Sequence, residues 1–176
     1  MTAFDDTIGP VAGAEGERDA LELAETARSR FEATEQAAVG HQLALERIQT
    51  CSRQLLIRIH DGPCRPQVLW VLEIGLAMLT AVMAVNREPV PVSDRVDPAS
   101  FAMSVLRDLA SAAAQRELEF AVLEQEAAGM LRQLEQDGFS NLEAYWALNW
   151  ATASVELGWA RSLAEAESND ENGEDA

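Results

Sequence analysis

Residues 68–85 read VLWVLEIGLAMLTAVMAV and carry one charged side chain, Glu73, in eighteen positions. A helix that is apolar on every side either lies at the centre of a bundle or crosses a membrane. This stretch is at the lower limit of the length that spans a bilayer, it contains an acid, and Arg65 and Arg87 flank it without favouring one end. The sequence therefore predicts a central helix over residues 67–86 and leaves a membrane span as the alternative.

Helix-ending residues separate this segment from its neighbours. On the N-terminal side, Gly62 and Pro63 mark the end of a first helix, which we expect over residues 17–60. On the C-terminal side, Pro89 and Pro91 keep the chain extended, because proline lacks a backbone donor and restricts the residue before it. The apolar helix thus has a tight connection before it and a longer one after it.

Capping residues define a third helix after the extended stretch. Asp97 followed by Pro98 is an N-cap with proline at the first helical position. Gly138 is suited to the left-handed position that ends a helix. Together these signals predict a helix over residues 98–137.

The first and third helices share a heptad pattern, in which apolar residues alternate at spacings of four and three. The pattern runs through Ala20, Ala24, Ala27, Phe31, Thr34, Ala38, His41, Leu45, Ile48, Ser52, Leu55 and Ile59, and again through Ala102, Leu106, Leu109, Ala113, Arg116, Phe120, Leu123, Ala127, Met130 and Leu134. An unbroken pattern predicts two long helices that pack together. More helices must cover them, because alanine is frequent in both patterns.

A capping box of Ser140 and Glu143 starts a fourth helix, which we expect over residues 141–167. This helix contains three of the four tryptophans and has two apolar stripes, so it needs two partners. Aromatic residues of this kind are enriched at interfaces between chains. The side chains that we expect at an interface are Tyr145, Trp146, Trp150, Trp159 and Leu163.

The expected fold is all-α, with a single domain over residues 17–167. We predict an elongated four-helix bundle with two long heptad-patterned helices, one short apolar helix and one Trp-rich C-terminal helix. Residues 1–16 and the acidic residues 168–176 have no apolar periodicity and are expected to form disordered tails.

Three polar residues, Glu73, His41 and Arg116, occupy apolar positions of these patterns. If neighbouring helices run antiparallel, equal rises per residue bring Arg53 level with Glu73, so Arg53 is its expected partner. If the two long helices run parallel, His41 and Arg116 lie at one height and form a polar layer. Lone polar residues in a heptad core favour a role in register and partner choice rather than in catalysis.

The chain is strongly acidic, with thirty acidic and thirteen basic residues, all arginine, and a formal charge of -17. Such a surface repels phosphate, which argues against direct binding of nucleic acid. The absence of lysine excludes a Schiff-base lysine. Two cysteines are too few for a disulfide framework, and residues 1–10 lack the basic and apolar runs of a secretory signal, so we expect a cytoplasmic protein.

The sequence contains no motif for a cofactor, a metal or a catalytic group. His41 and His60 lack the Glu-x-x-His spacing of di-iron bundles. Cys51, His60, Asp61 and Cys64 lack the paired ligand spacing of zinc sites, and a Cys64–His60 nucleophile pair lacks an orienting group. We therefore expect no cofactor and no metal.

These patterns favour a non-enzymatic helical interaction protein, such as an oligomeric scaffold, an adaptor or a chaperone-like subunit. Its expected partner is another protein or a second copy of the chain, and the surplus apolar face of the fourth helix motivates this expectation. The alternative is a membrane-associated protein that inserts residues 67–86, in which Glu73 would be costly and functional.

Overall fold

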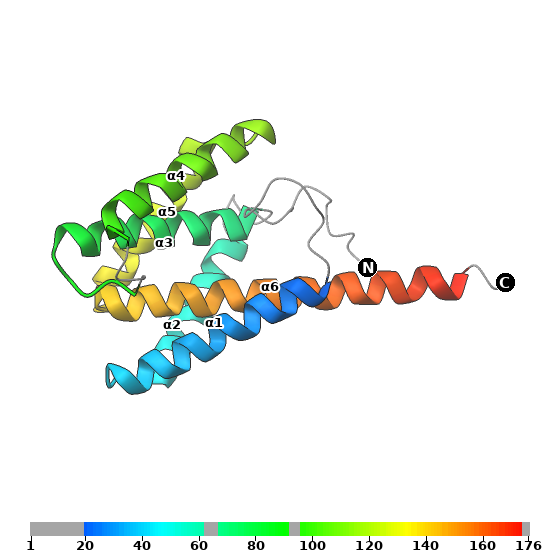
Figure 1. The fold of residues 1–176 in the computed structure, drawn as a ribbon, viewed down its shortest axis with the longest axis horizontal. Helices are drawn as coiled ribbons and strands as arrows, with labels where there is room; N and C mark the ends of the chain where they lie inside the picture. Colours follow the sequence, from blue (N-terminus) through cyan, green and yellow to red (C-terminus); the bar gives the residue numbers. More distant parts are fainter. Residues whose placement is uncertain (1–19, 62–66, 92–95, 174–176) are drawn as a thin grey trace.

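A computed structural model describes residues 20–61, 67–91 and 96–173, with side chains described as far as residue 164. These ranges contain no strand and six helices (Figure 1), namely α1 (Ala20–Gly40), α2 (Leu45–Asp61), α3 (Val68–Val85), α4 (Pro98–Gln115), α5 (Phe120–Gln136) and α6 (Asn141–Gly173). The all-α class is confirmed. The four-helix arrangement is wrong in one respect, because each of the two expected long helices is divided in two.

Each long segment is interrupted by a four-residue turn of the same kind, residues 41–44 and 116–119, which we call an elbow. At the end of α1, Leu43 N–H donates to the Ala38 carbonyl at 2.8 Å, and Gln42 takes a left-handed backbone with φ 55°. At the end of α4, Leu118 N–H donates to the Ala113 carbonyl at 2.9 Å, and Glu117 has φ 57°. This geometry is the Schellman motif, which satisfies the last carbonyls of a helix and reverses the chain.

A residue with a left-handed backbone also follows α3 and α5. Arg87 has φ 58°, and Gly138, where the sequence predicts a left-handed stop, has φ 77°. The predicted caps are also confirmed: the Asp97 carboxylate accepts from Ser100 N–H at 2.9 Å, and Ser140 N–H donates to Glu143 Oε2 at 2.9 Å. The α6 helix continues to Gly173, beyond the expected end at 167. Residues 1–16, Gly62 and Pro63 lie outside the described ranges.

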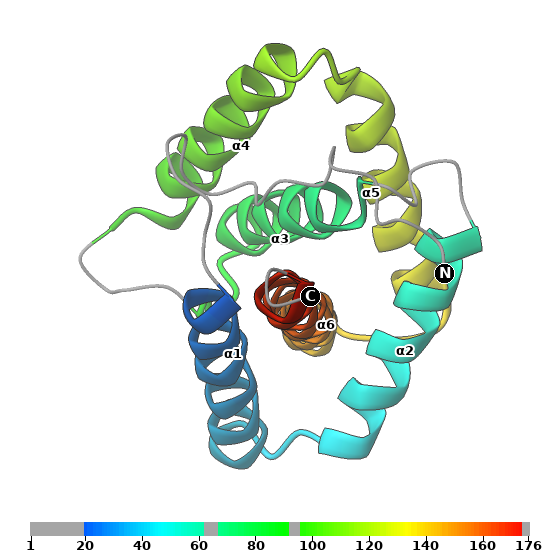
Figure 2. The same cartoon turned by 90° about the vertical axis from the view of Figure 1, so that its right-hand side faces the viewer.

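Two central helices, α3 and α6, run in opposite directions, and four helices surround them (Figure 2). The α1–α2 hairpin packs on α6, while the α4–α5 hairpin packs on α3. Eleven residues of α3 are buried, among them Trp70, Leu72, Ile74 and Met83. The apolar segment therefore lies at the centre of the fold, with α6 beside it and the α4–α5 hairpin around it.

The two hairpins repeat each other along the chain. Seven of the nine residues buried in α1 and α2 correspond to residues 75 positions later that are buried in α4 and α5. The corresponding residues are Ala27, Thr34, Ala38, Ile48, Ser52, Leu55 and Ile59 in the first hairpin and Ala102, Leu109, Ala113, Leu123, Ala127, Met130 and Leu134 in the second. The residues of the predicted heptad pattern thus form the inner faces of two bent hairpins rather than one straight seam.

Replacing Gln42 by glycine should stabilise the protein by about 0.5–1 kcal/mol. An L-residue at a left-handed position costs about 1–2 kcal/mol, which glycine avoids at the expense of a more flexible unfolded chain. Urea denaturation of Gln42→Gly measures the change. The matched control is Gln36→Gly on the exposed face of α1, which should lower stability by about 1 kcal/mol. A loss of stability in both variants would contradict this account of the elbow.

Candidate functional site

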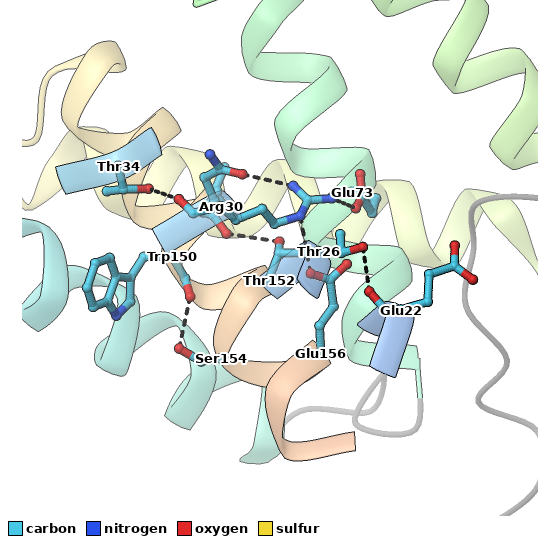
Figure 3. A network of polar contacts seen from close by, with 11 residues as sticks. Glu22, Thr26, Arg30, Thr34, Glu73, Trp150, Thr152, Ser154 and Glu156 are labelled. Carbon is cyan, nitrogen blue, oxygen red and sulfur yellow. Dashed lines mark hydrogen bonds and ion pairs between the residues drawn. The ribbon is translucent and has the colours of Figure 1, made fainter. Parts of the chain in front are cut away.

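A cluster of polar side chains joins α1, α3 and α6 around Arg30 (Figure 3). The guanidinium donates to Glu73 Oε1 of α3 at 2.7 Å and to Asn149 Oδ1 of α6 at 2.8 Å. Its Nε lies 3.2 Å from Glu156 Oε2, also of α6. We call these four residues the Arg30 cluster. It contains the most extensive set of charged contacts between distant parts of the described chain.

The Arg30 cluster is largely removed from solvent. The Glu156 side chain is 5% exposed, and those of Arg30 and Glu73 are 24% exposed. The contact between Arg30 Nε and Glu156 Oε2 is an ion pair without the alignment of a hydrogen bond. One guanidinium therefore faces two carboxylates at partly buried positions, where the loss of one partner is expensive.

Neighbouring threonines add no charge and make no hydrogen bond to the side chains of the cluster. Thr34 Oγ1 donates to the Arg30 carbonyl at 2.8 Å, and Thr152 Oγ1 donates to the Leu148 carbonyl at 2.9 Å. Both threonines are thus satisfied within their own helices. Burial raises the pKa of Tyr145, and the charge of nearby Glu73 raises it further while Arg30 opposes the shift. The arrangement supports a fixed crosslink between three helices.

The predicted pairing of Glu73 with Arg53 is wrong, because Arg30 takes this position. Arg53 is exposed on α2. The prediction assumed that α2 and α3 lie side by side as an antiparallel pair. The elbow after α1 instead directs α2 along α6, and the Arg30 side chain of α1 reaches Glu73.

The predicted layer of His41 and Arg116 is also wrong, because both residues are exposed. They follow α1 and α4, which run in opposite directions, so the two elbows lie at opposite ends of the helical body (Figure 1). The Arg116 guanidinium lies 5.7 Å from the centroid of the Trp70 ring, a distance typical of a cation–π contact. Neither residue acts as a buried register element.

The expected interface residues differ in their exposure. Trp146 is only 7% exposed, so it belongs to the core of this chain and is not free for a partner. Tyr145 packs edge-on against Trp146, and Trp150 packs edge-on against Phe31 at 4.5 Å between centroids. Trp159 and Leu163 on α6 are half-buried. Of the five expected residues, these last two lie nearest the end of α6, and their role at an interface stays a prediction.

An apolar groove between the start of α1 and the second half of α6 was not predicted. It has a volume of about 670 Å³ and is lined by Ala20, Leu21, Ala24, Leu157, Ala160, Arg161 and Ala164. We call it the α1–α6 groove. The small side chains on both helices leave it open, and Leu21 is 67% exposed. Alanine spacing in the heptad pattern was a signal for close packing, but it did not indicate that the described helices leave this groove open.

A second unpredicted feature ties α2 to the start of α6. Arg47 pairs with Glu143 at 2.8 Å, donates to the Gly138 carbonyl at 2.8 Å, and lies over the Phe139 ring at 4.5 Å. Sequence position gave no signal for this contact, because Arg47 is at an exposed position of the heptad pattern. The contact fixes the end of the first hairpin against the connection between α5 and α6.

The thiol and histidine side chains are not gathered into a reactive site in the described part of the chain. Burial raises the pKa of Cys51 to about 12, with a further increase from Glu143 and an opposing effect of Arg47. Such a thiol is not a nucleophile at neutral pH. His60 lies 3.4 Å from Asp61 at an exposed position, and Cys64 is outside the described residues. The described residues contain no group of three metal-ligating side chains.

Comparison with known proteins assigns no family: no family model matches, and no curated protein or solved structure is significantly similar to the chain.

Replacing Arg30 by methionine should lower the free energy of unfolding by about 3 kcal/mol. The change leaves two partly buried carboxylates without their cation, and this type of loss costs several kcal/mol in protein interiors. Urea denaturation at pH 7 measures it. Arg53→Met is the matched control, because this residue is exposed and should change stability by less than about 0.5 kcal/mol. Equal effects of the two substitutions would show that the Arg30 cluster does not stabilise the fold.

The capping box of α6 should make stability fall in acid. Burial tends to raise the pKa of Glu143, but hydrogen bonds from Ser140 and the charge of Arg47 hold it below its usual value of about 4.5. A carboxyl whose pKa is lower in the folded state stabilises the fold above its unfolded pKa, and this contribution is lost as the pH falls through the folded pKa.

Thermal unfolding of the protein and of Glu143→Gln between pH 7 and pH 3 tests this dependence. The parent should unfold at the higher temperature at pH 7, and the difference should disappear toward pH 3. Glu124→Gln, on the exposed face of α5, controls for the loss of one negative charge. A parent advantage that persists unchanged at pH 3 would contradict the proposed role of the carboxylate.

Proposed function

We propose that the chain is a non-enzymatic helical interaction protein, which binds a cationic amphipathic helix of a protein partner in the α1–α6 groove. The observation that carries this proposal is the groove itself, which combines an apolar lining with an open surface. It lies between the first residues of α1 and residues 157–164 of α6, and α6 continues past the start of α1 (Figure 1). One face of α6 is therefore left without the cover that the hairpins give to the rest of the central pair.

The shape of the groove suits a helical ligand. Its two walls are helices, and four of its seven lining residues are alanines, which allow the close approach of a third helix. Amphipathic helices bind such grooves through apolar residues spaced three and four apart. Leu21 and Leu157 supply the larger apolar contacts. Trp159 and Leu163 lie on the same part of α6 but do not line the groove.

The negative net charge of the chain favours a cationic partner. The chain has a formal charge of -17, and the helix that forms the far wall of the groove ends in the acidic sequence of residues 165–173. On α1, Glu22 and Glu25 flank Leu21 and Ala24 along the chain and are exposed. A negative surface attracts cationic segments and repels anionic ones, nucleic acid included. A second copy, which is equally acidic, suits this groove less well than a basic helix.

Structural roles account for the ionisable groups that the described helices bring together, which supports a binding function rather than catalysis. Arg30 neutralises part of the charge of Glu73 and Glu156, and Glu143 caps a helix. Cys51 is buried in the core. None of these groups lines the α1–α6 groove.

Membrane association through α3 is the second candidate, because Val68–Val85 is the one described helix that is long and apolar enough to span a bilayer. Insertion would require α3 to leave α6 and the α4–α5 hairpin. It would also separate Glu73 from Arg30 and place a carboxylate in hydrocarbon, at a cost of several kcal/mol. The packing of α3 therefore favours the interaction protein over the membrane protein.

A fluorescent helical peptide of lysine and leucine tests the groove. One peptide of about eighteen residues carries its leucines on one face, as amphipathic ligands do, and a second has the same composition in scrambled order. Anisotropy at about 0.15 M salt, where long-range attraction is screened, should show tighter binding of the first. Leu21→Asn should weaken this binding about tenfold, which corresponds to about 1.4 kcal/mol.

Val39→Asn is the matched control, because Val39 is a similarly exposed apolar residue on α1, with 82% of its surface accessible, and lies outside the groove. It should bind the peptide as the parent does. Equal affinity for the two peptides, or an equal loss in both variants, would show that attraction is only electrostatic and would contradict the proposed site.

A further inference from the structure

The chain consists of two units that have little packing of their own. Unit one is residues 20–85 (α1 to α3), and unit two is residues 98–164 (α4, α5 and most of α6). The first hairpin packs on α6 of unit two, the second hairpin packs on α3 of unit one, and the two central helices pack on each other. Within each unit, the helices make few contacts with one another, apart from the ion pair of Arg30 and Glu73 between α1 and α3. The hydrophobic core is therefore an interface between the units.

The specific contacts between side chains cross the same interface. In α1, Arg30 of unit one binds Asn149 and Glu156 of unit two, as Figure 3 shows for Glu156. Arg47 of unit one pairs with Glu143 of unit two at 2.8 Å. In the other direction, Arg116 of unit two lies over the Trp70 ring of unit one. These contacts need both units, although Arg30 also pairs with Glu73 inside unit one.

One covalent connection joins the two units, from Asn86 to Asp97. We infer that a second copy of this chain can supply unit two to unit one, so that two chains exchange units and form a dimer with the core of the monomer built twice. Every contact between units described above would form again between chains. The partner contributes half of the Arg30 cluster in this dimer, and it also supplies the α6 wall of the α1–α6 groove, which is rebuilt between the chains.

The connection sets the balance between the two forms. Because both forms contain the same core, the monomer is favoured only by the effective concentration of unit two near unit one, which is in the millimolar range for short connections. Arg87 at φ 58° and Pro89 turn the chain away from α3 and allow it to return. Removing these stops should favour an extended connection and hence the exchanged dimer. Two chains of charge -17 repel each other, so salt should also favour it.

Crosslinking between chains distinguishes exchange from other association. Arg47→Cys and Glu143→Cys are made in separate chains that also carry Cys64→Ala, while buried Cys51 is retained. The two variants are mixed, unfolded, refolded at about 1 µM to about 1 mM, a range that spans the effective concentration, and treated with a short bismaleimide. Exchange predicts a 47–143 crosslink between chains that increases with concentration and with salt.

The matched pair is His41→Cys mixed with Arg116→Cys. Both residues are exposed, and their elbows lie at opposite ends of the body (Figure 1), so exchange does not bring them together. The triple variant Arg87→Ala, Pro89→Ala, Pro91→Ala should increase the 47–143 crosslink at least about fivefold at equal concentration, since it weakens the return that maintains the effective concentration.

Absence of the 47–143 crosslink at the highest concentration, with helicity retained in circular dichroism, would overturn the inference. Equal crosslinking of the 47–143 and 41–116 pairs would also overturn it, because that result indicates association without exchange. If the triple variant fails to fold, the test rests on the 47–143 crosslink in chains that keep the original connection, measured as the protein concentration rises. The peptide experiment measures binding to the α1–α6 groove, which the monomer and the exchanged dimer both contain, so failure at the groove and failure of exchange are separate results.

Discussion

The constraint on which the fold depends is the apolar surface of α3, which must be covered on all sides. A helix with one charged residue in eighteen gains from the removal of each face from water, at roughly 25 cal/mol per Å² of apolar surface. One partner helix covers only one face. The chain meets this requirement with α6 on one side and the bent α4–α5 hairpin around the others. The single charge, Glu73, is then accommodated by an arginine that reaches it from α1.

Each central helix is covered by a hairpin with an elbow, α6 by α1–α2 and α3 by α4–α5. A straight helix of about forty residues would be 60 Å long and would extend far beyond α3, which at 1.5 Å per residue is about 27 Å long. Four residues without helical structure divide each long segment into two arms of 17 to 21 residues, close to the 18 residues of α3. The left-handed Gln42 and Glu117 are strained positions, but each elbow allows two inner faces to contact one central helix.

The sequence predicted the helix ends that proline, glycine and capping boxes mark, and it placed the apolar segment correctly at the centre. It did not predict the elbows, because the four-residue breaks preserve the alternation of four and three: Ala38, His41 and Leu45 continue the pattern, as do Ala113, Arg116 and Phe120. Neither left-handed residue is a glycine or an asparagine. Periodicity reports which face is buried, but it does not report whether the helix carrying that face is continuous. The errors at Arg53, His41 and Arg116 all follow from this one omission.

The similarity of the two hairpins creates a problem of specificity that the Arg30 cluster solves. Because the buried residues correspond at a constant spacing of 75, either hairpin offers an inner face of similar size and apolar character to either central helix. Arg30, however, has no counterpart, since Val105 occupies the corresponding position in α4. Only the observed pairing brings Arg30 to Asn149 and Glu156 of α6 while it also reaches Glu73 of α3. The reverse pairing would place Arg30 on α3, away from Asn149 and Glu156. A partly buried ion pair contributes little net stability compared with apolar packing, but misplacing one partner costs several kcal/mol. The cluster therefore distinguishes between two arrangements that hydrophobic packing alone would leave nearly equal in energy.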